Sequence, residues 1–191
     1  PEGQVALIVD LLDRVRHAFP LSLPVLLMAD RGIGTSPDLI RAVEDQRGID
    51  ILFRVQQTCL FRHWHSHHTI ALKEMAQSGQ VWQQVGDVFK KAGWLPLIAT
   101  VAQASDYDQA WCLVSTTPVG PALYAHRFQQ EVSLRDLKSD GFQWHRSHVW
   151  IPAHADRLLL VLALTYALVM HVGQALPIAK SGRLSRHSIF R

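Results

Sequence analysis

The sequence predicts an α/β fold, because of the order in which four predicted segments follow one another near its start. Apolar residues recur at helical spacing within residues 4–18, with charged residues opposite them. Residues 25–29 form a short continuous apolar run, typical of a strand buried on both faces. A second helix is expected over residues 39–46 and a second strand over residues 49–55. Helix, strand, helix, strand is the order of an α/β domain.

Local signals mark where these elements end. Pro20 and Pro24 end the first helix, because proline lacks the backbone N–H that a helix interior needs. The first strand stops at Asp30-Arg31-Gly32. Ser36 or Thr35 is the expected N-cap of the second helix, with Pro37 in its first turn. Gly48 ends that helix before the second strand begins.

The composition changes between residues 57 and 118. The runs 95–101 and 110–116 are β-like, and the turn-rich stretch 105–108 between them predicts a hairpin. We interpret this region as a β-rich insertion. The predicted organisation is therefore a partial core over 1–56, the insertion over 57–118, and a C-terminal helical part over 119–191.

The C-terminal part contains a strongly apolar helix. Residues 158–178 carry no charged residue, yet the stretch includes Thr165, Tyr166 and His171, and only residues 158–170 are densely apolar. A bilayer span needs about 20 apolar residues. We therefore predict a buried core helix rather than a membrane span, followed by a basic tail.

The bulk composition fits a folded domain that can meet nucleic acid. Of the 191 residues, 48% are apolar and 18% are charged, which disfavours disorder. The net charge is +3 and the pI about 9.1, which permits a nucleic-acid partner. Cys59 and Cys112 are the two cysteines, and we expect them unpaired in a reducing compartment. The chain opens with Pro1 rather than Met, so we expect a truncated or processed start.

Four residues within and directly after the predicted helix 123–137 carry chemistry. Tyr124, Arg127, Glu131 and Lys138 are spaced by 3, 4 and 7, so at about 100° per residue they share one stripe. A carboxylate flanked by cations and a phenol can bind a metal and contact a phosphate backbone. The alternative is a solvated face stabilised by an Arg127–Glu131 pair.

This Y-x-x-R-x-x-x-E-x-x-x-x-x-x-K spacing resembles the signature of a group of bacterial insertion-sequence transposases with an RNase H-like, retroviral-integrase-like core. Residues 26–32, LLMADRG, resemble the strand of that family that ends in the second catalytic aspartate. An aspartate at the carboxyl end of a strand is where open α/β sheets place their chemistry. Residues 186–190 resemble the family's C-terminal stretch, so the resemblance covers the chain from about residue 4 to its end.

The resemblance implies a catalytic role for two acids. Asp30 would be the second metal-binding carboxylate and Glu131 the third, together holding two Mg²⁺ ions, with Mn²⁺ as a substitute. Arg127 and Lys138 would contact DNA phosphates, and Tyr124 would pack or hydrogen-bond at the same DNA end. The implied partners are double-stranded DNA, as terminal inverted repeats and target, and a second copy in a homodimer. The implied setting is the bacterial cytoplasm, with no membrane.

The family's first aspartate has no counterpart here. Asp10 and Asp13 precede Asp30 by only 20 and 17 residues and lie on the first helix, so three strands cannot fit between. We therefore expect an N-terminally truncated RNase H-like core lacking its first three strands. A non-catalytic DNA-binding remnant is the alternative, and a membrane-associated or structural protein is a third hypothesis. For the histidine-rich segment 62–68, a polar loop near DNA is favoured over a zinc site, which usually needs more cysteines.

Overall fold

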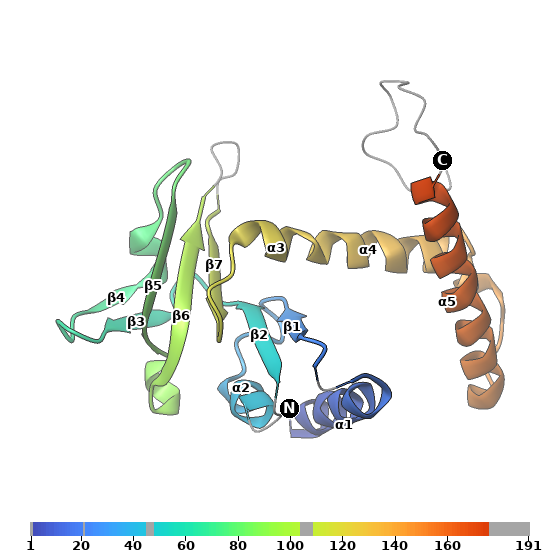
Figure 1. Cartoon of the computed structure of the whole chain (residues 1–191), viewed down its shortest axis with the longest axis horizontal. Coiled ribbons are helices and arrows are strands. Elements are labelled where there is room, and N and C mark those ends of the chain that lie inside the picture. Colours follow the sequence, from blue (N-terminus) through green and yellow to red (C-terminus); the bar gives the residue numbers. More distant parts are fainter. Residues whose placement is uncertain (1, 21, 45–47, 104–108, 176–191) are drawn as a thin grey trace. The chain divides into compact units, whose positions relative to one another are not determined.

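The computed structural model describes residues 2–20, 22–44, 48–103 and 109–175 (Figure 1). The chain divides into two compact units, Pro1–Ala125 and His126–Arg191. The sequence-predicted boundaries at 56/57 and 118/119 stay predictions. Each unit is described by itself below.

The first unit carries the sheet and the first helices. Its elements, in chain order, are α1 (Glu2–Ala18), β1 (Val25–Ala29), α2 (Pro37–Glu44), β2 (Ile49–Arg54), β3 (Leu60–His63), β4 (Thr69–Ala71), η1 (Leu72–Met75), β5 (Val81–Val88), η2 (Lys90–Ala92), β6 (Leu95–Ala102), β7 (Trp111–Ser115) and α3 (Pro121–Ala125). The helix, strand, helix, strand order predicted for the first part of the chain is confirmed.

One mixed sheet joins the predicted core to the predicted insertion. Its seven strands run in the order β1-β2-β7-β6-β5-β3-β4. The β1–β2 pair is parallel, and every other pair is antiparallel. The predicted hairpin pairing is present, with Ile98 opposite Ser115 and Ala102 opposite Trp111; its turn at 104–108 lies outside the described residues. The α/β class is therefore correct in its coarse form.

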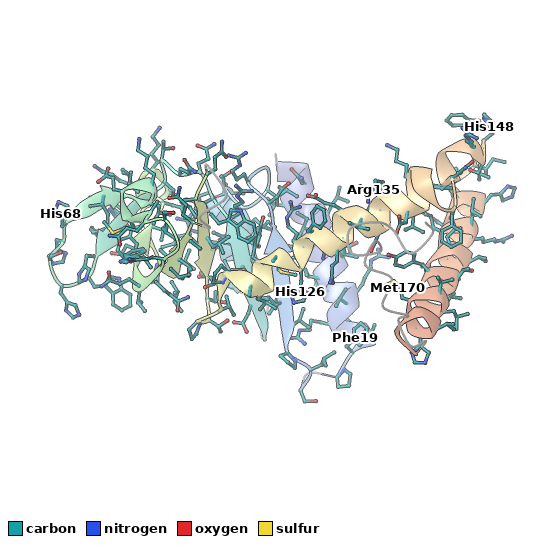
Figure 2. All side chains as sticks on the ribbon, turned by 90° about the horizontal axis from the view of Figure 1, so that it is seen from above. Phe19, His68, His126, Arg135, His148 and Met170 are labelled. Atoms are coloured by element: carbon teal, nitrogen blue, oxygen red, sulfur yellow. The ribbon has the colours of Figure 1, made fainter. Side chains whose placement is uncertain are left out.

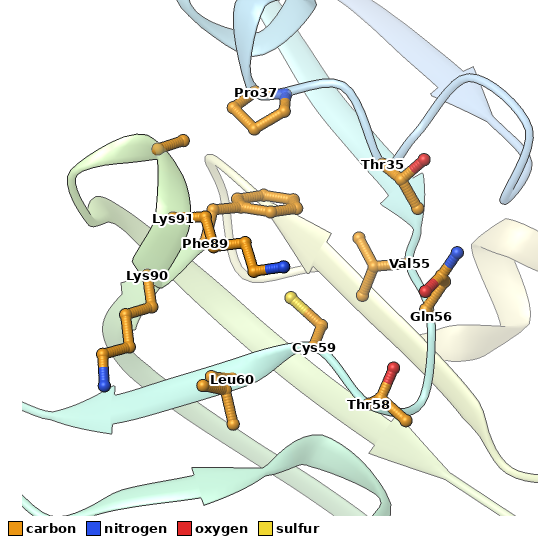
Figure 3. A pocket seen from close by; sticks show the side chains of 11 residues that line it. Thr35, Pro37, Val55, Gln56, Thr58, Cys59, Leu60, Phe89, Lys90 and Lys91 are labelled. Carbon is orange, nitrogen blue, oxygen red and sulfur yellow. The ribbon is translucent and has the colours of Figure 1, made fainter.

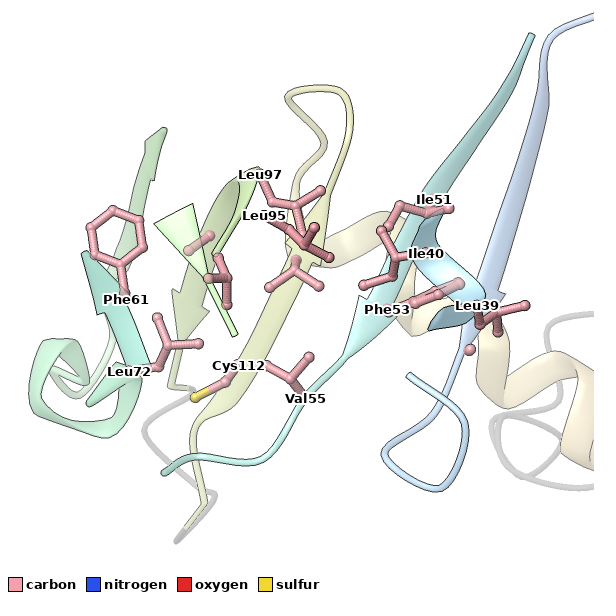
Figure 4. Packing of buried hydrophobic residues seen from close by; sticks show 14 of the residues in the cluster. Leu39, Ile40, Ile51, Phe53, Val55, Phe61, Leu72, Leu95, Leu97 and Cys112 are labelled. Atoms are coloured by element: carbon pink, nitrogen blue, oxygen red, sulfur yellow. The ribbon is translucent and has the colours of Figure 1, made fainter. Parts of the chain in front are cut away.

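The main core lies between α2 and one face of the sheet. Figure 4 shows Leu39 and Ile40 of α2 facing Ile51 and Phe53 of β2, and all four side chains are at most 1% exposed. Apolar positions three and four apart put Leu39, Ile40 and Val43 on one side of α2. The same cluster continues under the insertion strands, so the sheet has one continuous core on this face.

Strand β1 differs from the prediction of a strand buried on both faces. Four of its five residues are only partly buried, and Ala29 alone is fully buried. The physical reason is its place in the sheet: among the described strands, β1 pairs with β2 only and forms an edge. An apolar run predicts burial, but it does not show how many neighbouring strands supply that burial.

An ion pair contacted by two tryptophans links strands β3 and β5 of the insertion. Arg62 on β3 donates to Oδ2 of Asp87 on β5 through Nε at 2.9 Å and Nη2 at 2.6 Å. The indole N–H of Trp64 donates to Oδ1 of Asp87 at 2.9 Å. The Arg62 guanidinium also lies 4.5 Å from the ring centre of Trp94. Asp87 is thus the shared acceptor of three hydrogen bonds between adjacent strands.

We expect this cluster to make stability depend on acid pH. Partial burial alone raises the pKa of Asp87, but hydrogen bonds from Arg62 and Trp64 and the charge of Arg62 outweigh it and lower the pKa. A lowered folded-state pKa contributes stability that is present above the unfolded value of about 3.9 and is lost as the pH falls below it. In Asp87→Asn, the unfolding temperature should fall less between about pH 6 and pH 3 than it does in the wild type. An unchanged pH profile would contradict the assignment.

The second unit consists of helices. Its elements are α4 (Arg127–Arg135), the π-helical turn η3 (Asp136–Asp140), η4 (Trp144–Arg146) and α5 (Pro152–Ala175). Figure 2 labels His126 and Arg135 at the two ends of α4 and Met170 on α5. The hydroxyls of Ser133 on α4 and Tyr166 on α5 are hydrogen-bonded at 2.8 Å, which holds the two helices together.

The structure contradicts the prediction that the apolar C-terminal helix, α5, is buried in the core. Pro152–Val172 is apolar and long enough to cross a membrane by length and composition, and none of that window is buried. Five apolar side chains are more than half exposed: Leu160, Val161, Leu164, Leu168 and Val172. The prediction was wrong because a helix that is apolar on all sides shows no preferred inner face, so its composition does not specify its neighbours.

Candidate active site

Asp30 directly follows β1, at the carboxyl end of the parallel β1–β2 pair. Its side-chain Oδ1 accepts a hydrogen bond from the backbone N–H of Gly32 at 2.9 Å, and its carbonyl oxygen accepts from Ile33 and Gly34. These bonds fold residues 31–35 into a turn directly beside the carboxylate. Asp30 is solvent-exposed, so a ligand can approach its side chain.

The strand that leads to Asp30 turns two of its side chains to the sheet face opposite the main core. Leu26 and Met28, four and two residues before Asp30, contribute to a second apolar cluster with Leu52, Leu113 and Tyr124. Within the first unit, Tyr124 at the start of the signature segment therefore packs on the sheet face that Leu26 and Met28 line. Leu26 and Met28 of the strand before Asp30 therefore share one apolar cluster with Tyr124, which lies far along the chain.

Gly34 holds the turn after Asp30 against the end of β2. A Cβ at this position would lie 2.5 Å from the carbonyl oxygen of Arg54 and 2.8 Å from that of Asp30. Both neighbours are backbone atoms that cannot rotate away. The turn would therefore have to move as a whole.

We expect Gly34→Ala to lower the free energy of unfolding by about 1–3 kcal/mol, as for other overpacked sites. Chemical denaturation measures this change directly. Gly120→Ala is the matched control, because no heavy atom lies within 4 Å of its added Cβ. Equal stability of both variants would show that the turn is not tightly packed.

The signature segment is not the single straight α-helix that the 100° count assumed. Helix α3 ends at Ala125, α4 begins at Arg127, and residues 136–140 form a π-helical turn. A π turn has more residues per turn than an α-helix, so Lys138 is not where that count places it relative to Glu131. The prediction that all four residues share one stripe of a helix is therefore wrong for Lys138.

Tyr124 is a packed residue of the first unit. It is 3% exposed, and its ring meets that of Trp111 edge-on at a centroid distance of 5.5 Å. Its position anchors α3 on the sheet. The contact with DNA implied for Tyr124 stays a prediction.

Arg127 and Glu131 form an ion pair along α4. Arg127 Nη2 donates to Glu131 Oε1 at 2.5 Å, and the Glu131 side chain is 52% exposed. The Arg127–Glu131 pair expected for a solvated helix face is thus present, and such exposed pairs contribute little to stability. The pair also orients the carboxylate and leaves half of its surface open to solvent. Either role is compatible with this geometry.

The five predicted site residues are divided between the units. Asp30 and Tyr124 belong to the first, and Arg127, Glu131 and Lys138 belong to the second. Within the described ranges, no three His, Cys, Asp or Glu side chains gather into a metal-binding group. Asp10, one of the two acids upstream of Asp30, pairs with Arg14 on α1 at 3.0 Å. The carboxylate oxygens of Asp30 and Glu131 are the hard ligands that Mg²⁺ prefers.

Sequence reasoning missed two charged residues that the structure makes notable. Asp136, in the π turn of the signature segment, is 1% exposed, and both of its carboxylate oxygens lack a hydrogen-bond partner among the described residues. Arg54, the last residue of β2, has a buried Nε that likewise lacks a partner there. Burial without a partner is costly for a charged group. Neither residue stands out in the sequence, because burial depends on distant neighbours.

A cavity of about 530 Å³ lies on the first unit, between the loop before α2 and the η2 turn. Its lining includes Cys59, Phe89, Lys90 and Lys91 and contains no carboxylate (Figure 3). Burial raises the pKa of the Cys59 thiol to about 11. Burial and the neighbouring Cys59 likewise raise the pKa of Cys112 to about 11, so neither thiol is an activated nucleophile at neutral pH. Both cysteines are free, as the sequence predicted.

The histidine-rich segment forms a hydrogen-bonded turn between β3 and β4. Nδ1 of His63 accepts from the backbone N–H groups of His65 at 3.1 Å and Ser66 at 3.4 Å. Nε2 of His63 meets the side-chain amide of Gln84. These contacts give His63 a structural role in the turn. The proximity of this loop to DNA stays a prediction.

No protein-family model and no curated protein matches this chain in sequence comparisons.

Proposed function

We propose that this chain is part of a DNA transposase with an RNase H-like core, which cuts and joins DNA at insertion-sequence ends by metal-dependent phosphoryl transfer. The observation that carries the proposal is the placement of Asp30. It stands at the carboxyl end of a parallel strand, and the signature helix starts on the same sheet face at Tyr124. Tyr124 of the signature motif and Leu26 and Met28 of the strand motif come from separate parts of the sequence and pack in one apolar cluster of the first unit.

In this proposal Asp30 and Glu131 hold Mg²⁺, with Mn²⁺ as a substitute. When bound, two ions would polarise the scissile phosphate and activate a water molecule or a 3′-hydroxyl. Arg127 orients Glu131 through the ion pair that it already makes. Arg127 and Lys138 also supply positive charge for the phosphates flanking the cut, and Tyr124 anchors the start of the helix on the sheet.

The first carboxylate of the family is assigned to a strand outside this sequence. Among the described strands β1 pairs with β2 alone, so its other edge offers backbone groups to such a strand. A strand that pairs there in parallel would end at the same edge of the sheet as Asp30. The resulting site would collect carboxylates from two strands and one helix. Double-stranded DNA and a second copy of the chain are the proposed partners.

We expect Arg127→Ala and Lys138→Ala each to weaken binding to a mixed-sequence DNA duplex and to shallow the salt dependence by about one phosphate contact. Fluorescence anisotropy over a series of salt concentrations measures both quantities. Arg14→Ala is the matched control, since Arg14 is 76% exposed on α1 and lies outside the signature segment. If both variants keep the wild-type affinity and salt slope, the helix does not contact the backbone and the proposal fails.

A non-catalytic DNA-binding remnant is the second candidate function. The ion pair between Arg127 and Glu131 favours it, because a carboxylate already engaged by a cation binds a metal less readily. This candidate predicts the same DNA binding and no binding of a divalent ion at Asp30.

A further inference from the structure

The cavity between the loop before α2 and the η2 turn is built from parts of the first unit that lie far apart in the sequence. Its lining comes from the start of α2, from the segment that follows β2, and from the turn between β5 and β6. The volume of about 530 Å³ lies within the range of small-molecule sites. None of the residues proposed to bind metal or DNA lines it, so the cavity is a separate site.

The lining combines apolar surface with positive charge. Val55 is buried at 1% exposure, and Phe89 adds an aromatic ring. Lys90 and Lys91 are exposed, and no residue of the lining is an acid. Figure 3 shows the amine of Lys91 pointing toward the middle of the cavity and that of Lys90 pointing away from it. A flat apolar group that carries one negative charge is complementary to this lining.

Phe89 occupies its place in the lining at a conformational cost. Its backbone lies in the left-handed region, with φ 64° and ψ 62°, which disfavours a bulky side chain. Its carbonyl oxygen accepts from the N–H groups of Ala92 at 2.9 Å and Trp94 at 3.4 Å, so the turn fixes this conformation. A glycine here would avoid the cost but would remove the ring from the cavity. Backbone strain of this kind concentrates at ligand-contacting sites.

We propose that this cavity binds a small organic anion with a planar apolar body and one phosphate or carboxylate head group. The planar body lies against the ring of Phe89, and the head group pairs with the amine of Lys91. The exposed hydroxyl of Thr58, in the same lining, offers the head group a further donor. This site goes beyond the proposed transposase activity and does not depend on it.

Calorimetric titration of the whole chain with matched probes tests the proposal. The probes are 1-naphthyl phosphate and 1-naphthoate, which share a planar body and differ in the head group. At least one should bind with a Kd below about 1 mM, as expected for a ligand of this size. Two fragments of the probe, 1-naphthol without a head group and inorganic phosphate without the body, should each bind at least about tenfold more weakly.

Two lysine variants distinguish a built site from surface charge. Lys91→Gln should weaken binding about tenfold, because its amine points into the cavity. Lys90→Gln is the matched control: it removes the same charge from the same turn and should weaken binding less than about threefold. Equal losses in the two variants, equal binding of 1-naphthol, or no binding of either probe would overturn the proposal.

Protection of a thiol locates the bound probe. Cys59 lines the cavity, whereas Cys112 is fully buried in the core. Labelling with methyl methanethiosulfonate, followed by peptide mass spectrometry, measures the modification of each cysteine separately. A saturating probe should slow the labelling of Cys59 several-fold. Unchanged labelling of Cys59 while the probe is bound would place the probe elsewhere and overturn the site. No DNA is present in these experiments, so their outcome is independent of the proposed function.

Discussion

Incubated with supercoiled plasmid DNA and either Mg²⁺ or Mn²⁺, the chain should leave the DNA uncut. In the proposed site, Asp30 and Glu131 are two of three carboxylates, and the third is assigned to a strand outside this sequence. Each Mg²⁺ needs near-octahedral coordination with its charge neutralised, while water and phosphate oxygens occupy the remaining positions. With two carboxylates, one ion loses much of its protein coordination, and the nucleophile is no longer held in line with the leaving oxygen.

The expected effect is all or none, and agarose gels that separate supercoiled, nicked and linear plasmid measure it. Glu131→Ala is the control for contaminating nucleases, because trace nicking by a contaminant persists in that variant. Nicking by the wild-type chain that disappears in Glu131→Ala would contradict the prediction. It would mean that another acid, such as Asp10 or Asp13, completes the site.

The sequence predicted the elements whose pattern is local. Periodicity and capping located α1, α2 and β2 within a few residues, and the two β-like runs of the insertion are the paired strands β6 and β7. These signals are carried by neighbouring residues and by the proline, glycine and serine positions between them. The position of Asp30 at the end of β1 followed from the same reasoning.

The features that the sequence did not predict depend on distant contacts. The insertion strands continue the sheet of β1 and β2 because β7 pairs with β2, and no local pattern specifies that partner. The partial exposure of β1 and of α5 depends on what lies beside them. The π turn at 136–140 interrupts a segment whose composition suits an α-helix. The burial of Nε of Arg54 and of the carboxylate of Asp136 depends on the residues packed around them, which the sequence does not show.

The central claim is that Asp30 and Glu131 share one divalent ion, and iron-directed backbone cleavage tests it most directly. Fe²⁺ bound in place of Mg²⁺ generates hydroxyl radicals with ascorbate and peroxide, which cut the polypeptide within a few ångströms of the ion. The proposal requires the carboxylate oxygens to lie within roughly 4–8 Å of each other, since paired ions are about 3.5–4 Å apart. Cuts should therefore map near residue 30 and near residue 131 of the same chain.

Single substitutions decide whether one ion causes both cuts. Asp30→Asn should abolish the cut near residue 131 as well as that near residue 30, and Glu131→Gln should do the same in reverse. Asp38→Asn is the matched control, since that side chain is 83% exposed and pairs with Arg41 on α2, and it should keep both cuts. A cut at only one position, or a cut near residue 131 that survives Asp30→Asn, would contradict the shared site and with it the catalytic assignment.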